Sequence, residues 1–321
     1  PRKRILLIRF LHGLTAEKFP VKQLVEKPMR KFYSKVREFE TVLRHQLSKD
    51  GRISEFLSLP LSEIYRRNQV AWMDIWKKSI QFDEFSDERR KIINSFQFYL
   101  YCSVNDDATS LAPLGLSEAG WNGAQFWDTD FWMFRAILPV KPEFAAARIR
   151  YRHKCIPEAR KYAEKNGLKG LWYCWKTDDL GRPVAKPEYE NEIHLSAWVA
   201  LSVLDYRKAT GDEEFYRKYG VEIVCGIADA FYSRGSFDTD GKFHLRNVLG
   251  PDEALHEIHH RYCDDNFLTN YAVASIFRAA AAEGGSPDLI RAADKMFLSD
   301  ADSEGIIPEH YGYAGDRKSV V

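Results

Sequence analysis

The sequence predicts an all-α fold, on the basis of two observations. Apolar residues recur at the spacing of an amphipathic helix in most of the chain, for example at Ile193, Ala197 and Leu204. No strand–helix–strand rhythm of a parallel sheet accompanies them. The segments between the periodic stretches are long, which in a compact domain is typical of functional loops. These loops are residues 105–128, 167–190 and 235–263.

Start and stop signals set the bounds of the predicted helices. Ser86 precedes two acids and is a typical N-cap, Asn166-Gly167 is a typical C-terminal stop, and Pro287 suits the first position of a helix. Short strands fit near 243–249. Hairpins of such helices either stack as a solenoid or close into a ring, and composition does not distinguish the two. The predicted helices are residues 62–79, 86–104, 143–165, 191–209, 212–234, 266–283 and 287–299.

Composition narrows the class of protein. Hydrophobic residues make up 45% and charged residues 29% of the chain, which predicts a globular core and argues against disorder. The net charge of +1 provides no field for nucleic acid or an anionic membrane. The five cysteines form no C-x-x-C pair, so a reducing, cytoplasmic setting is expected. The chain also lacks a phosphate-binding glycine loop and a G-x-S-x-G elbow, and its apolar run near Ile5 is too short for a signal peptide or a membrane span.

The first candidate site is the aromatic and acidic segment 120–133, which contains Trp127 and Asp128. A carboxylate beside an indole can accept hydrogen bonds from two sugar hydroxyls while the ring covers the apolar face of a pyranose. Under the alternative interpretation, Asp128 caps a helix beside a core Trp127 and a core Trp132. Sequence physics alone leaves both interpretations open.

The second candidate site is the loop 247–253, in which Gly250-Pro251 forces a tight turn before Asp252 and Glu253. A carboxylic acid in a partly apolar pocket keeps its proton near neutral pH, and it can donate that proton to a glycosidic oxygen. Under the alternative interpretation, Asp252 caps a helix and Glu253 lies in its first, solvated turn.

A third pattern, His256-Glu257-Ile258-His259-His260, matches H-E-x-x-H, in which two histidines bind zinc. The third ligand is missing, because Cys263 and Asn266 occupy the positions of the expected glycine and histidine. We therefore expect solvated loop histidines and no metal site.

Four blocks in a fixed order together resemble glycoside hydrolase family 65, the inverting α-glucoside phosphorylases and hydrolases. The resemblance runs from about Ser62 to the C-terminus and rests on G-[YF]-N-G-x-x-F-W-D-T-[DE]-x-W-M, E-x-H-[IL]-x-A with a later T-G-D, V-[IV]-G-P-D-E, and N-x-x-T-N. The matching residues are Gly120–Met133, Glu192–Ala197 with Thr210–Asp212, Val248–Glu253, and Asn266–Asn270.

The resemblance implies a partial (α/α)6 barrel at 62–321, with a helical linker region on its N-terminal side and an N-terminal remnant or linker at 1–61. It implies that Glu253 is the general acid, and that Trp127 and Asp128 hold the non-reducing glucose in subsite −1. His194 would lie nearby as a structural or subsite residue. Lys318 stands where the family has the lysine of a substrate-binding K-Q-A-D block, with Ser319 in place of the glutamine.

The implied enzyme cleaves an α-glucosidic bond of a disaccharide or oligosaccharide with inversion, and it uses either inorganic phosphate or water. It needs no metal or cofactor and has no nucleic-acid or membrane partner; a homodimer is left open. The family's later phosphate-binding loop is absent from these 321 residues, so we expect the chain to be C-terminally incomplete and the two reactions to remain undistinguished. The family's aspartate after H-x-x-A is replaced by Trp198. The alternative from another class is a truncated, non-catalytic carbohydrate-binding remnant of the same fold.

Overall fold

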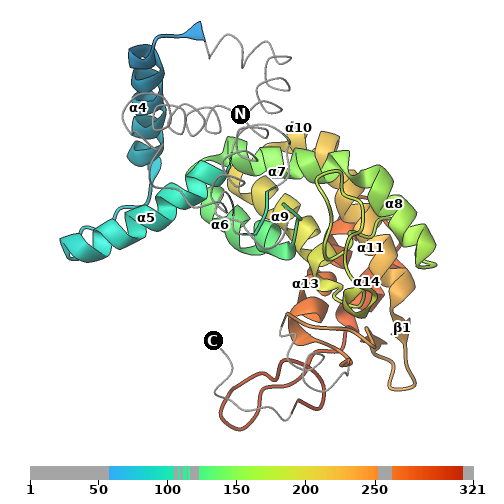
Figure 1. The fold of residues 1–321 in the computed structure, drawn as a ribbon. Helices are drawn as coiled ribbons and strands as arrows, with labels where there is room; N and C mark the ends of the chain where they lie inside the picture. Colours follow the sequence, from blue (N-terminus) through green and yellow to red (C-terminus); the bar gives the residue numbers. More distant parts are fainter. Residues whose placement is uncertain are drawn as a thin grey trace, which may run out of the picture. The chain divides into compact units, whose positions relative to one another are not determined.

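The computed structural model describes residues 58–104, 108, 111–113, 115, 123–251 and 262–313 (Figure 1). The chain divides into two compact units, Pro1–Ser79 and Ile80–Val321. Helix α4 (Leu61–Lys78) belongs to the first unit and buries Ile64 and Ile75. This division falls after α4, whereas the boundary expected from the sequence precedes it; the role of 1–61 stays a prediction.

In the described part of the second unit, the regular secondary structure is helical apart from one small hairpin, as the sequence predicts. Strands β1 (Ser236–Phe237) and β2 (Phe243–His244) pair antiparallel, with Ser236 opposite His244. Two of the helical segments, η3 and η5, are π-helical turns, and η4 is a 3₁₀ turn. The segments are α5 (Asp87–Ser103), η3 (Thr129–Met133), α6 (Phe134–Ile137), α7 (Pro142–Lys154), α8 (Ile156–Lys165), η4 (Pro187–Tyr189), α9 (His194–Thr210), α10 (Glu213–Phe215), η5 (Tyr216–Gly220), α11 (Val221–Arg234), α13 (Phe267–Ala282) and α14 (Asp288–Asp294).

Helix α9 is the central element of this unit. It packs against α7, α11 and α13, and α13 in turn packs against α11 and α14 (Figure 1). Residues on every side of α9 are buried, from His194 and Leu195 at its start to Tyr206 near its end, as expected for a helix enclosed by others. It ends at Gly211, whose φ of 67° lies in the left-handed region that glycine adopts without strain.

Three predicted helices differ from the observed ones for identifiable reasons. The helix predicted at 143–165 breaks at Cys155, because Pro157 lacks an N–H and its ring would clash with the preceding turn. The helix predicted at 212–234 is observed as α10 and α11 with the π-helical turn η5 between them. The helix predicted at 287–299 stops at Asp294, because the next residues pair with β2: the Phe243 amide donates to the Lys295 carbonyl at 2.7 Å.

The loop after α8 crosses α11 in close contact and reaches the segment before Trp127. The Leu171 amide donates to the Gly226 carbonyl at 2.8 Å, and a Cβ atom on Gly226 would lie 2.5 Å from the Leu171 Cγ. Farther along, Gln125 and Thr177 exchange two backbone hydrogen bonds of 2.7 and 3.1 Å. This crossing therefore sets where the chain enters the helix that carries the first candidate site.

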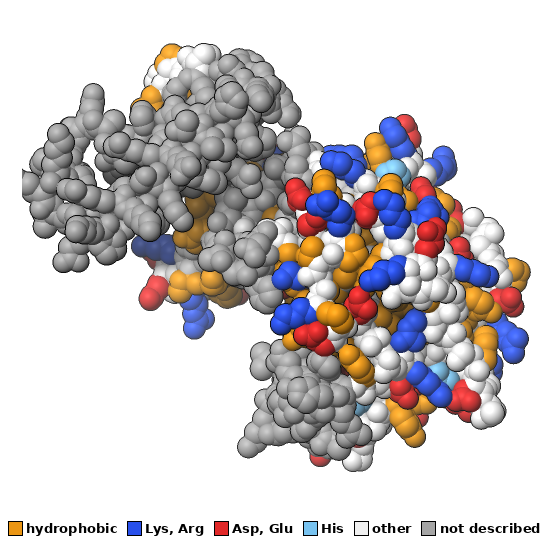
Figure 2. Space-filling view, turned by 45° about the vertical axis from the view of Figure 1, so that its right-hand side comes forward, with side chains coloured by type: hydrophobic (Ala, Val, Ile, Leu, Met, Phe, Trp, Pro, Cys, Tyr) orange, Lys and Arg blue, Asp and Glu red, His pale blue; other side chains and the backbone are white. Residues whose placement is uncertain are grey.

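Acidic and basic side chains are interspersed over the face of the molecule drawn in Figure 2, without a broad area of one sign. This distribution agrees with the net charge of +1. Among the described residues, no helix combines the length and the apolar character that a membrane span requires.

Candidate functional site

Trp127 and Asp128 lie at the start of a continuous helical run that passes through the π-helical turn η3 into α6. Asp128 has helical backbone angles of −50° and −39°, and its side chain makes no capping hydrogen bond. Trp127 is half-buried, and the Trp132 side chain is 58% exposed. The interpretation as a helix cap beside two core tryptophans is therefore wrong. π-Helical turns occur frequently at functional sites.

The Trp127 indole forms one wall of the candidate site together with neighbouring rings. It stacks on Phe131 at a centroid distance of 5.0 Å and contacts Trp132 at 6.0 Å. The His194 imidazole also meets it edge-on at 4.8 Å. An indole fixed on several sides offers a rigid, flat apolar surface, which is the type of surface that a sugar ring covers.

The Asp128 carboxylate lies half-buried beside this wall. Burial raises the pKa of its carboxyl, its own backbone amide opposes that shift, and the charge of Asp130 adds to it. The described side chains provide no hydrogen bond to its oxygens. These oxygens are therefore suited to accept hydrogen bonds from a polar ligand, such as vicinal sugar hydroxyls.

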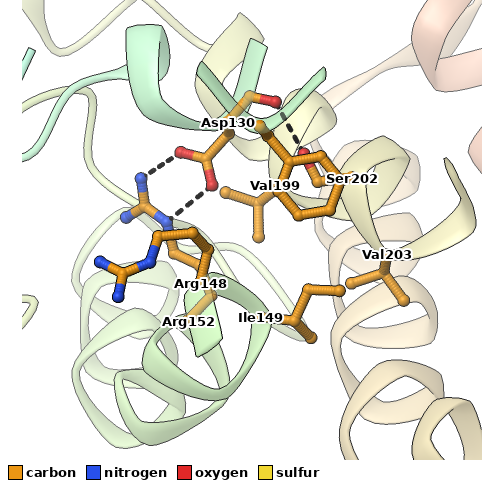
Figure 3. Close-up of a pocket in the computed structure, with 8 residues that line it drawn as sticks. Asp130, Arg148, Ile149, Arg152, Val199, Ser202 and Val203 are labelled. Atoms are coloured by element: carbon orange, nitrogen blue, oxygen red, sulfur yellow. Dashed lines mark hydrogen bonds and ion pairs between the residues drawn. The ribbon is translucent and has the colours of Figure 1, made fainter. Parts of the chain in front are cut away.

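Asp130, two residues later, has a different role. Its carboxylate accepts two hydrogen bonds from the Arg152 guanidinium, one from Nε at 3.1 Å and one from Nη2, and both side chains are 3% exposed (Figure 3). The Ser202 hydroxyl donates to the Asp130 carbonyl at 2.7 Å. Burial alone would lower the pKa of Arg152, but Asp130 outweighs burial and raises it. The pair joins η3 to α7, and Ser202 joins η3 to α9, so Asp130 fixes the helical run that carries Asp128.

His194 is the first residue of α9 and is completely buried. Its Nε2 lies 3.9 Å from an oxygen of the Glu192 carboxylate, which is itself buried. Burial lowers the pKa of the imidazole to about 4, although contact with the Leu249 backbone favours the charged form. The ring is therefore neutral at pH 7. The second candidate loop comes close to this end of α9 through the Leu249 amide, which donates to the Asn191 carbonyl.

The start of the second candidate loop is fixed by backbone pairing. Val248 and Cys263 exchange two hydrogen bonds of 2.8 Å, and the Leu249 amide donates to the Asn191 carbonyl at 2.9 Å. A Cβ atom on Gly250 would lie 2.3 Å from the Asn266 Nδ2, so a side chain at this position would have to displace that of Asn266. The loop therefore leaves the helical core beside Asn191, three residues before His194.

The structure brings Trp127, Asp128 and His194 together, but two other predicted site residues lie outside the described residues. These are Glu253 and Lys318, and the H-E-x-x-H pattern at 256–260 lies outside them as well. Within the described ranges, no group of three or more His, Cys, Asp or Glu side chains has the arrangement of a metal site.

Sequence reasoning missed the residues that hold the site from behind, above all Arg152. An arginine in an Ala- and Arg-rich helix looks like a solvated residue. Arg152 and Asp130 are 22 residues apart in the sequence, and only the fold brings them into contact. The one signal in the sequence was the second aspartate in Trp127-Asp128-Thr129-Asp130, since on a helix two acids at this spacing face different surroundings.

Comparisons with known proteins identify relatives of the chain. Residues 92–316 match the family model described as "Glycosyl hydrolase family 65 central catalytic domain". Kojibiose hydrolase of Mucilaginibacter mallensis is 33% identical over 223 residues, which cover 68% of this chain and 32% of that protein. Kojibiose phosphorylase of Thermoanaerobacter brockii is 31% identical over 225 residues, which cover 65% and 28%. The chain thus spans about a third of the length of these curated relatives.

A solved structure described as "Putative kojibiose phosphorylase from human microbiome" has the same fold. It superposes with a TM-score of 0.70 at 20% identity, and the match covers 87% of this chain and 38% of that one. The predicted (α/α)6-barrel fold class, represented here in part, is confirmed by this likeness.

The first prediction concerns the buried ion pair. Arg152→Met leaves the Asp130 carboxylate buried without its partner, which should lower the free energy of unfolding by about 3–5 kcal/mol. The matched control is Arg160→Met, which breaks the half-exposed pair with Glu222 and should cost no more than about 1 kcal/mol. Urea unfolding followed by circular dichroism measures both. Equal effects of the two variants would contradict the structural role of Asp130.

The second prediction concerns the pH dependence contributed by His194. Between pH 6.5 and about 4, the unfolded chain binds a proton at this residue that the folded protein does not, so stability falls as the pH is lowered through this window. The full difference is about 3 kcal/mol, from about 2.5 pKa units at 1.36 kcal/mol each. His194→Phe should therefore show a flatter loss of stability over this range. The free energy of unfolding is measured for the wild type and the variant at pH 7, 5.5 and 4. An equal loss in both proteins as the pH falls would show that the imidazole is not buried in its neutral form.

Proposed function

The chain belongs to glycosyl hydrolase family 65, and we propose that it carries the glucose-binding and acid-bearing part of an enzyme that cleaves an α-glucosidic bond with inversion. One observation carries the proposal. The Trp127 indole meets the His194 imidazole at 4.8 Å, and the Leu249 amide donates to the Asn191 carbonyl at 2.9 Å, three residues before His194, so three segments far apart in the sequence meet here. Relatives named for both hydrolysis and phosphorolysis of kojibiose support a glucosyl donor, with phosphate or water as the nucleophile.

In the proposed mechanism, Trp127 and Asp128 hold the glucose whose bond is cleaved. The indole covers one face of the ring, and the carboxylate accepts hydrogen bonds from hydroxyls in a half-buried environment, where such bonds are stronger than in water. His194 supports Trp127 from the side as a neutral ring. Because it does not change charge above about pH 5, it keeps this wall constant over the working range of pH.

Glu253 is proposed as the general acid, three residues after Gly250. It would protonate the glycosidic oxygen while the nucleophile attacks the opposite face of the sugar, which inverts the anomeric configuration. Phosphate is already an anion at neutral pH and attacks without a protein base, whereas water requires a second carboxylate to accept its proton. Lys318 is a candidate for substrate or phosphate binding. No metal or cofactor takes part in this mechanism, and a cytoplasmic location and a homodimer belong to the proposal as expectations.

The experiment that tests the proposal follows the product by proton NMR. The full chain is incubated with kojibiose, with and without inorganic phosphate. A β-configured product supports inversion; β-glucose 1-phosphate formed only with phosphate indicates phosphorolysis, and β-glucose formed without it indicates hydrolysis. An α-configured product would overturn the proposed mechanism. Saturable sugar binding without turnover would favour the non-catalytic carbohydrate-binding alternative.

The third prediction concerns Glu253. Glu253→Gln removes the proton donor but keeps the size of the side chain, so turnover of an α-glucobiose should fall by about 10²–10⁴-fold with little change in substrate binding. Initial rates and a binding isotherm measure the two effects. A variant with a nearly unchanged rate would refute the assignment.

The fourth prediction concerns Asp128. Asp128→Ala removes hydrogen bonds that strengthen in the transition state. The activation free energy obtained from kcat/KM should therefore rise by several kcal/mol, roughly the contribution of charge-assisted bonds in a desolvated site. The melting temperature should change little, because the side chain makes no cap hydrogen bond. Normal activity with a lowered melting temperature would instead assign Asp128 a structural role.

A further inference from the structure

A buried network of polar side chains lies at the stem of the loop that leads to Glu253. At its centre is Asp265, which is 3% exposed and has a positive φ of 55°. Its Oδ2 accepts a hydrogen bond from the His244 Nδ1 at 2.7 Å. Its Oδ1 accepts from the Leu245 amide at 3.1 Å and from the Asn270 Nδ2 at 3.0 Å. One carboxylate thus ties together β2, the end of the loop and α13.

Asp265 holds a backbone conformation that non-glycine residues rarely adopt. A left-handed residue of this kind persists when its surroundings determine it, and such residues are found frequently at functional sites. Here the three hydrogen bonds to the side chain hold the residue in this conformation. The Asp265 amide also donates to the Leu245 carbonyl at 2.8 Å. The strained residue lies directly beside Asn266, which caps α13 through the Thr269 amide.

The stem continues without interruption from Asp265 to Gly250. After Leu245, the Asn247 amide donates to the Asp264 carboxylate at 2.8 Å, and Val248 pairs with Cys263. The Gly250 backbone then packs against the Asn266 side chain. The described residues 247–250 and 263–266 are therefore held in fixed register. Among the described residues of this stem, only Asp265 has a carboxylate that bonds His244, Leu245 and Asn270 of α13.

We propose that the Asp265–His244 pair is a positioning device that sets the register of the loop carrying Glu253 relative to the glucose-binding wall. The inference rests on the proposed function of Glu253. Because proton donation requires the acid within hydrogen-bond reach of the glycosidic oxygen, a loop stem displaced by a few tenths of an ångström weakens acid catalysis before it weakens glucose binding. His244 and Asp265 do not touch the substrate.

His244 offers a matched control within the same network. Its Nε2 lies 3.1 Å from Asp240, a half-exposed carboxylate in the turn of the β1–β2 hairpin. Asp240 and Asp265 thus bind the same imidazole, but only Asp265 also bonds the loop stem. A variant at Asp240 perturbs the ring electrostatically and leaves the stem contacts in place.

The test compares two glucosyl donors that differ in their need for a proton. Kojibiose has a sugar leaving group, which must be protonated, whereas fluoride leaves α-glucosyl fluoride with little acid assistance. In the full chain with phosphate present, Asp265→Asn should lower kcat for kojibiose about 10–100-fold, within the usual contribution of acid catalysis. The KM for kojibiose and the rate with α-glucosyl fluoride should remain within about threefold of the wild type by the same reasoning. Asp240→Asn should leave both donors within about twofold, since it affects only a half-exposed pair.

Two further variants keep the outcome decisive if Asp265→Asn folds poorly. His244→Asn keeps a hydrogen-bond donor near the position of Nδ1 and should keep most of the wild-type rate with kojibiose. His244→Leu removes the donor and should lower the ratio of the kojibiose rate to the α-glucosyl fluoride rate. The Glu253→Gln variant separates the two hypotheses. If Glu253→Gln does not lower this ratio, the proposed function fails. If Glu253→Gln lowers it but Asp265→Asn and His244→Leu do not, or if they slow both donors equally, the positioning role is overturned.

Discussion

The buried ion pair between Asp130 and Arg152 is the constraint on which the candidate site depends. Two charges that are 3% exposed are tolerable only when the geometry is close to ideal, because each loses several kcal/mol of hydration on burial. The bidentate contact provides that geometry, and the nearby Arg148, whose pKa burial lowers to about 10, adds positive charge. This requirement fixes the rotation of the helical run about its axis. Asp128, two residues earlier, is thereby directed to a different, half-buried environment.

The same helical run meets α9 at two successive turns. His194 contacts Trp127, and Trp198, one turn later on the same face of α9, contacts Phe131 at 4.2 Å. Side chains four residues apart on each helix thus pack in a matched pair of contacts. Since the Leu249 amide donates to the Asn191 carbonyl just before α9, the position of α9 determines how far the second candidate loop lies from the indole. The site is therefore assembled by helix packing together with the backbone pairing of the loops that enter it.

Much of the fold could be predicted from the sequence, but the arrangement of the site could not. Periodicity identified the helices because their apolar residues recur at helical spacing, and Ser86 and Asn166-Gly167 marked helix ends through local chemistry. It failed where one residue changes the geometry without changing the pattern, as at the π-helical turn η5 and at the break before Pro157. The blocks around Trp127, His194 and Gly250 were recognised one by one. Their contacts depend on packing between distant segments, and no single segment carries that information.

Trp198 has a consequence for the acceptor side of the site. Where the family carries an aspartate, this chain places an indole that is 6% exposed, with Phe131 on one side and the Arg135 guanidinium 5.0 Å from its ring. An indole has one donor and no acceptor, and within the described residues its Nε1 has no hydrogen-bond partner. The position therefore supplies apolar packing behind Phe131 and Trp127 and cannot accept a hydrogen bond from a hydroxyl group. Within the described ranges, Asp128 is the carboxylate adjacent to the Trp127 indole, and the charge-assisted contacts proposed for the glucose are assigned to that residue.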